Sequence, residues 1–161
     1  MTLRDPYERL MLLKGTATFA SVPLADLRIV AQELEEDACY PGELVFEAGD
    51  PSDRMYIIAA GRVGISLDPD RANRDFVSVL SRGACFGEMG LFDDLPRSAT
   101  AHVLEETHLL ALDKQRLQGL LESYPGLAIG LLRGLSLRVR DTNERVRGAG
   151  AGANGEERER G

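Results

Sequence analysis

Apolar residues follow a helical spacing at both ends of the chain and form short β-type runs in the middle. Asp5 and Gly15 carry the signals that start and stop a short first helix. Residues 24–34 repeat apolar positions at helical spacing and lead into the acidic run 35–37, which indicates a second helix that ends there. The apolar stripe of this second helix requires a core to cover it.

From Tyr40 onward the apolar residues gather in short runs separated by turn residues. Turn chemistry is present at Gly49-Asp50 and at Asp68-Pro69-Asp70. The runs themselves are ELVF, MYIIAAGRVGISL, DFVSVL, SATAHVL and HLLALD. Many short strands with helices confined to the two ends predict a mainly β fold with flanking helices (α+β), an antiparallel β-barrel or a double-stranded jelly roll, instead of alternating βαβ units.

Two helices are predicted after the β-type runs. Asp113 is suited to cap an amphipathic helix that stops near Pro125, and a longer helix follows. The longer helix carries a heptad seam formed by Ala128, Leu132, Leu135, Val139, Thr142 and Val146. Because this seam covers fewer than three heptads, docking on the barrel and pairing as a homodimer both stay open.

These patterns divide the chain into an arm, one domain and a tail. A helical N-terminal arm is expected at 1–18, and the domain at 19–147. Within the domain the barrel covers about 38–113 and the C-terminal helices about 114–147. The remainder, 148–161, is rich in glycine and then in charge, which predicts a disordered tail.

Composition and charge exclude several classes of function. No apolar run approaches the length of a bilayer span, and the first residues do not resemble a secretory signal, so a cytoplasmic protein is expected. A net charge of −7 opposes direct nucleic-acid binding. The two cysteines, Cys39 and Cys85, lie far apart and form no metal-ligand motif. The sequence therefore predicts neither a metal nor a cofactor.

The stretch 83–101, GACFGEMGLFDDLPRSATA, has the residues of an anion site. A glycine turn enters a short helical segment, whose first backbone N–H groups have no partner of their own and attract phosphate. Glu88 adds an acceptor for sugar hydroxyls, and Arg97 adds a rigid cationic fork. A ribose phosphate needs both groups, although an isolated Glu and Arg near glycines would more often be a turn with a surface salt bridge.

Residues 83–101 resemble the phosphate-binding cassette of the cyclic nucleotide-binding domain family. The similarity covers roughly residues 19–147 and includes Phe86-Gly87-Glu88, Leu91, Pro96-Arg97-Ser98-Ala99, Gly49-Asp50, Met55-Tyr56-Ile57-Ile58 and Gly61-Arg62-Val63. The resemblance implies an eight-stranded jelly roll with a helical cassette and a C-terminal lid helix. This agrees with the fold that the apolar pattern predicts.

The resemblance also implies a role for each cassette residue. Glu88 would accept the ribose 2′-hydroxyl and Arg97 would pair with the cyclic phosphate. The backbone amides of Gly87, Glu88 and Ala99 would surround the phosphate oxygens, and Ser98 would add a hydroxyl. In the lid helix, Thr142 and Asn143 would touch the base, often across a dimer interface in bacterial members, and Arg138 would be a further contact.

The other polar residues of interest have simpler interpretations. His102 and His108 have no partner at catalytic or metal-binding spacing, which favours positions on the surface of strands. Asp93 and Asp94 are adjacent, as in a solvated turn. Cys85 is interpreted as a small barrel residue, with redox sensing as the alternative.

Three functions are weighed. The first is a non-enzymatic sensor that binds cAMP, or less readily cGMP, and moves its lid helix toward an unknown downstream protein. The second is the ligand-binding half of a Crp-type transcription regulator. Only the glycine-rich tail follows Val146, so its helix-turn-helix is expected to be either absent or removed from this stretch. The third is a protein-interaction module with an unoccupied pocket.

Overall fold

The computed structural model describes residues 5–68 and 75–160, so residues 1–4 of the predicted arm, Pro69-Asp70 of a predicted turn and the last residue of the tail lie outside it. The helices are α1 (Pro6–Lys14), α2 (Leu24–Gln32), the short 3-10 helix η1 (Glu88–Leu91), α3 (Lys114–Ser123) and α4 (Pro125–Arg160). The strands are β1 (Glu35–Cys39), β2 (Leu44–Phe46), β3 (Arg54–Ala60), β4 (Val63–Ser66), β5 (Ser78–Leu80), β6 (Cys85–Phe86), β7 (Thr100–Val103) and β8 (Thr107–Asp113).

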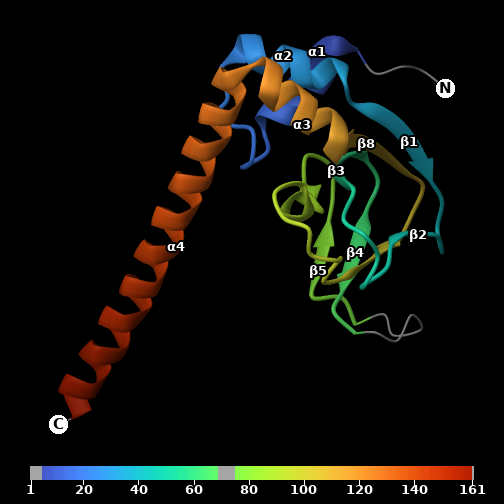
Figure 1. Cartoon of the computed structure of the whole chain (residues 1–161). Coiled ribbons are helices and arrows are strands. Elements are labelled where there is room, and N and C mark those ends of the chain that lie inside the picture. Colours follow the sequence, from blue (N-terminus) through green and yellow to red (C-terminus); the bar gives the residue numbers. More distant parts are fainter. Residues whose placement is uncertain (1–4, 69–74, 161) are drawn as a thin grey trace.

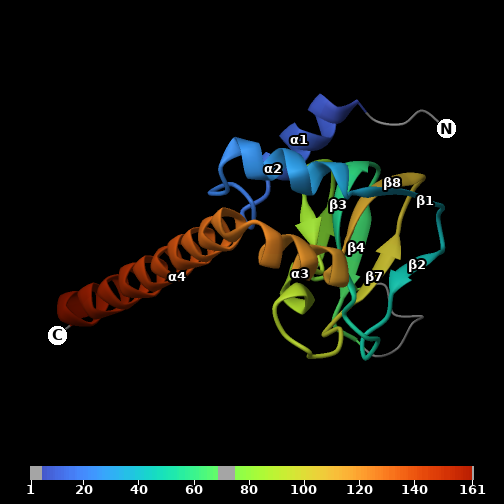
Figure 2. The same ribbon diagram turned by 45° about the horizontal axis from the view of Figure 1, so that its top comes forward.

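Within the described residues the strands form two four-stranded sheets that face each other as a jelly roll (Figure 1). The strand orders are β1-β8-β3-β6 and β2-β7-β4-β5, and every pair is antiparallel. The helices flank this barrel. Helices α1 and α2 lie together over the end of the barrel where β1 begins and β8 ends (Figure 2). The predicted mainly β fold with flanking helices is therefore confirmed.

Strand β3 is the strand that brings the cassette into the fold. On one side it pairs with β8, and on the other its Tyr56 lies opposite Phe86 of β6. Its side chains are buried on both faces: Met55 and Ile57 belong to the core under the helices, whereas Tyr56 and Ile58 belong to the core between the sheets. Burial on both faces explains the continuous apolar run that the sequence shows here.

The predicted capping residues lie at the ends of the helices. The Asp5 carboxylate accepts a hydrogen bond from the Tyr7 N–H (3.4 Å), and the Gly15 N–H donates to the Met11 carbonyl (3.0 Å). At α3 the Asp113 carboxylate accepts from the Gln115 N–H (2.8 Å). These bonds satisfy backbone groups that a helix end leaves without intrahelical partners.

Two predictions at the barrel are wrong. Glu35-Glu36-Asp37 does not end α2 but forms the edge strand β1, with Glu36 opposite Leu110 of β8. Exposure alternates along this strand, and Arg116 and Arg9 pair with Glu35 and Glu36. His102 is not on the surface: only 5% of it is exposed, and its ring packs 5.2 Å from the Phe76 ring centroid.

Helix α4 begins against the connection between α1 and α2 and then leaves the barrel (Figures 1 and 2). Gly130 allows this close start, because a Cβ there would lie 2.8 Å from the Val22 Cα. Farther along, the predicted seam is exposed at Leu132, Leu135 and Val139. Among the described residues, no helix combines the length and hydropathy that a bilayer crossing requires.

The C-terminal end of α4 differs from the predicted disordered tail. The helix continues through the glycine-rich segment to Arg160. Alanine, glutamate and arginine have high helix propensities, and they alternate with the unfavourable glycines in this segment.

Candidate functional site

The cassette connects β6 to β7 through a left-handed glycine and a short helix. Gly87 has φ +76° and precedes η1, which gives the glycine turn and helix start that the sequence predicts. A side chain at this position would be strained in backbone conformation, and its Cβ would lie 2.5 Å from Nη1 of Arg97. Gly87 therefore turns the chain and leaves room for the guanidinium beside it.

A cavity of about 430 Å³ opens along the cassette. Its lining includes the five residues that the sequence assigns to phosphate and ribose, namely Gly87, Glu88, Arg97, Ser98 and Ala99, together with Phe46, Ile65 and Phe86 of the barrel. This volume is within the ~300–1,000 Å³ that small-molecule sites usually have. The predicted phosphate and ribose residues thus share one cavity, with polar groups at the cassette and apolar groups at the barrel.

Arg97 is the buried cation of this cavity, with 6% of the residue exposed. Nη1 donates to the Gly87 carbonyl (3.1 Å), and Nη2 donates to the Arg54 carbonyl (2.6 Å). The guanidinium carbon lies 4.1 Å from the centroid of the Phe46 ring, in cation–π geometry. The guanidinium is therefore held in one orientation before any ligand arrives.

The charge of Arg97 is only partly compensated. Within the described residues its Nε is buried without a hydrogen-bond partner, and the Asp53 carboxylate 3.8 Å from Nη2 is 73% exposed. Burial lowers the pKa of Arg97, while nearby Tyr56, Asp53 and Asp50 raise it. A guanidinium stays protonated in proteins, so Arg97 lines the cavity as a buried cation whose Nε has no hydrogen-bond partner among the described residues. Such a group favours an anion.

Glu88 connects the cassette to the last helix. Its side chain is 19% exposed, and Oε1 lies 3.6 Å from Nη2 of Arg138 in α4. Arg138 is one of the three residues assigned to the base. Among the described ion pairs and hydrogen bonds, it is the only one of the three that contacts a cassette residue. Thr142 and Asn143 are exposed and do not line the cavity, and the Thr142 hydroxyl donates to the Arg138 carbonyl of its own helix (3.0 Å).

Phe46 lines the cavity, and Tyr56 and Asp53 lie beside Arg97, yet sequence reasoning gave none of the three a role in the site. The rings of Phe46, Tyr56 and Phe86 form a cluster with centroids 5.3–6.1 Å apart, and this cluster forms the wall on which Arg97 stacks. The signal in the sequence is weak, because the strands that bring these residues together are separated by turns of differing length. The position of Asp53 shortly after the Gly49-Asp50 turn is the signal that could have marked it as a residue near the site.

Asp93, Asp94 and His108 make local contacts in the structure. The Asp93 carboxylate accepts from the Leu95 N–H (3.0 Å), which is a local turn, and Asp94 pairs with Lys114 (3.0 Å). His108 lies on β8 with its side chain 35% exposed, 3.5 Å from Glu106. The predicted turn and the predicted surface position of His108 are both observed.

The cysteines are expected to resist alkylation in the folded protein. Burial raises the pKa of Cys39 to about 11 and raises that of Cys85 strongly, the second with a further contribution from the Glu88 charge. Below these pKa values the thiols are protonated, and the thiolate is the reactive form. At pH 8, iodoacetamide monitored by mass spectrometry should label both residues at least about tenfold more slowly than in denaturant. Labelling of Cys85 at the denatured rate would instead restore the redox-sensing alternative.

Comparison with known proteins places the chain among cyclic nucleotide-binding domains. The family model described as "Cyclic nucleotide-binding domain" matches residues 37–124. A crystal structure of the N-terminal domain of a transcriptional regulator from Streptomyces coelicolor superposes with a TM-score of 0.75 and 33% identity. That superposition covers 83% of this chain and 95% of the other.

Two curated relatives carry a related segment within longer proteins. The CRP-like cAMP-activated global transcriptional regulator of Mycobacterium tuberculosis is 27% identical over 135 residues, which is 84% of this chain and 60% of the relative. The cAMP-dependent protein kinase regulatory subunit of Dictyostelium discoideum is 34% identical over 112 residues, 68% of this chain and 32% of the relative. The chain therefore spans three fifths or less of these two proteins.

Proposed function

The chain belongs to the cyclic nucleotide-binding domain family, and on that premise we propose that it is a non-enzymatic sensor of a cyclic mononucleotide, cAMP in preference to cGMP. The observation that carries the proposal is the buried Arg97, which lines the same cavity as Glu88 and whose Nε has no hydrogen-bond partner among the described residues. A cyclic phosphate would supply the anion that the guanidinium lacks. Two relatives with cAMP in their names support cAMP as the ligand.

In this proposal each cassette group has one task. Arg97 and the backbone amides of Gly87, Glu88 and Ala99 hold the phosphate, and the Ser98 hydroxyl adds a donor. Glu88 is an acceptor when ionised and takes the ribose 2′-hydroxyl. The cation is required for this arrangement, because a carboxylate and a phosphate in one cavity repel each other unless a positive charge lies between them.

Titration calorimetry with cAMP, cGMP and a cyclic dinucleotide tests the assignment. We expect saturable heat with cAMP and weaker binding of cGMP. We expect no heat with the cyclic dinucleotide, because its two bases and two phosphates are too large for the cavity at the cassette. Absence of heat with all three would favour the interaction-module alternative, in which the cavity stays empty.

Helix α4 is proposed to report occupancy through Arg138. The ion pair between Arg138 and Glu88 (3.6 Å) joins α4 to the ribose acceptor before ligand binds. A ribose hydroxyl at Glu88 changes the partners available to Arg138, so the position of α4 changes. The ligand shifts α4 only by its differential affinity for the two positions. The exposed length of α4 beyond the barrel is the surface that a downstream protein would contact.

Replacing Thr142 and Asn143 together with alanine tests whether α4 also touches the base. In the described residues both are exposed and outside the cavity, so a base contact requires α4 to close or a second copy to supply the pair. We expect the double variant to bind cAMP about five- to thirtyfold more weakly, the loss of one or two hydrogen bonds of about 1 kcal/mol each. Unchanged affinity in calorimetry would remove the base contact from the mechanism.

A homodimer through α4 is proposed from the exposed seam. Leu132, Leu135 and Val139 are 52–64% exposed at heptad spacing, although burial of such residues is favourable. We expect Leu135→Asp with Val139→Asp to convert a dimer to a monomer in analytical ultracentrifugation. Leu137→Asp is the matched control, because Leu137 is equally exposed (61%) but lies off the seam. A wild-type monomer at all concentrations would overturn the proposal.

The second candidate function is the ligand-binding part of a Crp-type transcription regulator. It is favoured by the Streptomyces relative, which is itself the N-terminal domain of a transcriptional regulator and aligns over 95% of its length. In this case α4 would carry the ligand signal toward a DNA-binding region of the assembly. The ligand chemistry is the same in both candidates.

A further inference from the structure

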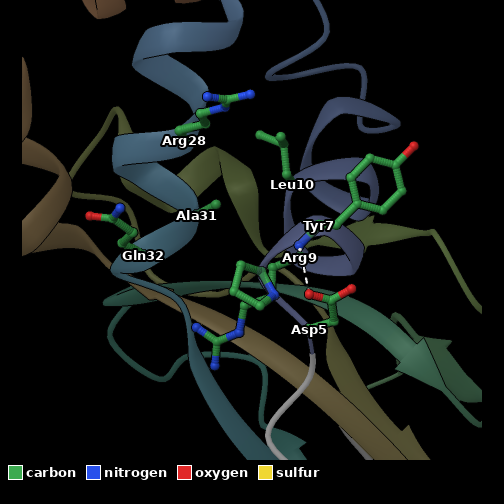
Figure 3. Close-up of a pocket in the computed structure, with 8 residues that line it drawn as sticks. Asp5, Tyr7, Arg9, Leu10, Arg28, Ala31 and Gln32 are labelled. Carbon is green, nitrogen blue, oxygen red and sulfur yellow. Dashed lines mark hydrogen bonds between the residues drawn. The ribbon is translucent and has the colours of Figure 1, made fainter.

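A second cavity, of about 690 Å³, lies between α1 and α2. Figure 3 shows residues from both helices around it, and none of them belongs to the cassette. Its volume also falls in the range of about 300–1,000 Å³ typical of small-molecule sites. The proposed nucleotide site makes no use of this cavity.

The floor of the α1/α2 cavity is apolar. Leu10 of α1 and Ala31 of α2 line it, are 7% and 5% exposed and belong to one core cluster, and Pro6 is a further lining residue. The ring of Tyr7, which is 66% exposed, stands at the rim. Groups of this kind contact alkyl or aromatic parts of a ligand and bind no hydrated ion.

Two of the charged residues that line the cavity, Arg9 and Asp5, already have hydrogen-bond partners within the protein. Nη1 of Arg9 donates to the Leu34 carbonyl (2.7 Å), and its Nη2 lies 3.9 Å from Glu36. The Asp5 carboxylate caps α1 through the Tyr7 N–H. Arg28 makes no hydrogen bond or ion pair recorded within residues 5–68 and 75–160. Figure 3 shows its side chain at the end of the cavity away from Asp5, extending toward the Leu10 side.

From this arrangement we propose that the α1/α2 cavity binds a small organic anion with an alkyl or aromatic body, such as an aromatic carboxylate. The body lies on Leu10, Ala31 and Pro6, and the anionic group pairs with Arg28. The separation of Asp5 from Arg28 places the repelling carboxylate at the other end. Because the residues are distinct from the cassette, this site is independent of the proposed nucleotide function.

Two dyes that differ in one anionic group test the proposal on the full chain. The probes are 8-anilinonaphthalene-1-sulfonate and N-phenyl-1-naphthylamine, which lacks the sulfonate. Titrations followed by ¹H–¹⁵N correlation NMR should give saturable shifts of the Tyr7, Leu10 and Ala31 amides with the anionic dye. We expect it to bind about tenfold more tightly than the neutral dye, the fold-change that one charge-assisted hydrogen bond produces.

Arg28→Gln should remove that preference by weakening the anionic dye about tenfold while leaving the neutral dye unchanged. Arg140→Gln is the matched control, because Arg140 is an exposed arginine of α4 outside both cavities. Unchanged affinity of Arg28→Gln for the anionic dye overturns the proposal. Two results with the wild type alone would also overturn it. The first is equal affinity for the two dyes, and the second is amide shifts confined to the cassette or to α4.

Discussion

Replacing Arg97 with glutamine is expected to reduce cAMP affinity by at least about 100-fold, the loss of two charge-assisted hydrogen bonds of about 1.5–3 kcal/mol each. Arg97 is a cation buried at the cassette, and its orientation is fixed by the Gly87 and Arg54 carbonyls and the Phe46 ring. Its Nε has no hydrogen-bond partner in the part of the chain that the structure describes. Glutamine removes the charge and keeps a polar side chain. Titration calorimetry with cAMP measures the loss directly.

The fold should tolerate this change, which separates binding from stability. Glutamine loses the carbonyl contacts but also relieves a buried charge that lacks a full partner, so we expect Tm to change by no more than about 4 °C. Arg62→Gln is the matched control, since Arg62 is 54% exposed, pairs with Glu105 (3.4 Å) and lies outside the cavity. Retained cAMP affinity in a folded Arg97→Gln would exclude the guanidinium from phosphate binding.

Local signals in the sequence predict the fold class well. They predict poorly the features that depend on distant contacts, such as the edge strand β1 and the burial of His102. Helix caps such as Asp113 act over three residues, and the alternation of strands and turns is also local. The acidic run 35–37 misled because its β-strand conformation depends on pairing with β8, more than 70 residues away, and on Arg9 and Arg116. The burial of His102 likewise depends on the distant Phe76 ring.

The site divides in the same way between local and distant contributions. The positive φ of Gly87 and the start of η1 follow from adjacent residues, so the phosphate part of the cassette is predictable. The stacking of Arg97 on Phe46 and its contact with Arg54 involve strands brought together by the barrel. The contact between Arg138 and Glu88 crosses 50 residues of sequence and depends on where α4 starts against Val22.

The position of α4 is the structural feature on which signalling would depend. Its start is fixed by close packing at Gly130. Among the described ion pairs, the part beyond the barrel contacts the cassette through one, the partly exposed pair of Arg138 and Glu88. Ion pairs of this exposure contribute about 0–1 kcal/mol. A contact so weak would be readily exchanged for a ligand contact, so in the proposed mechanism Glu88 is the residue that links ribose recognition to the position of α4.

Replacing Glu88 with alanine is therefore expected to abolish discrimination between cAMP and 2′-deoxy-cAMP. The wild type should prefer cAMP by about 10- to 100-fold, because one hydrogen bond from the 2′-hydroxyl to a carboxylate contributes about 1.5–3 kcal/mol. Without the carboxylate the two nucleotides should bind within about threefold of each other, and both more weakly than cAMP binds the wild type. Calorimetry with the two nucleotides gives the ratio.

Arg138→Ala separates ribose recognition from the helix contact. Because Arg138 meets Glu88 from α4 and is 41% exposed, its removal should leave the preference for cAMP over 2′-deoxy-cAMP intact while changing the position of α4, measured as a spin-label distance from the barrel to α4. Glu105→Ala, which breaks the surface pair with Arg62, should change neither quantity. If Glu88→Ala keeps the 2′-hydroxyl preference, the ribose acceptor must lie elsewhere. If Arg138→Ala abolishes that preference, the arginine and not the carboxylate reads the sugar, and the proposed exchange at Glu88 is wrong.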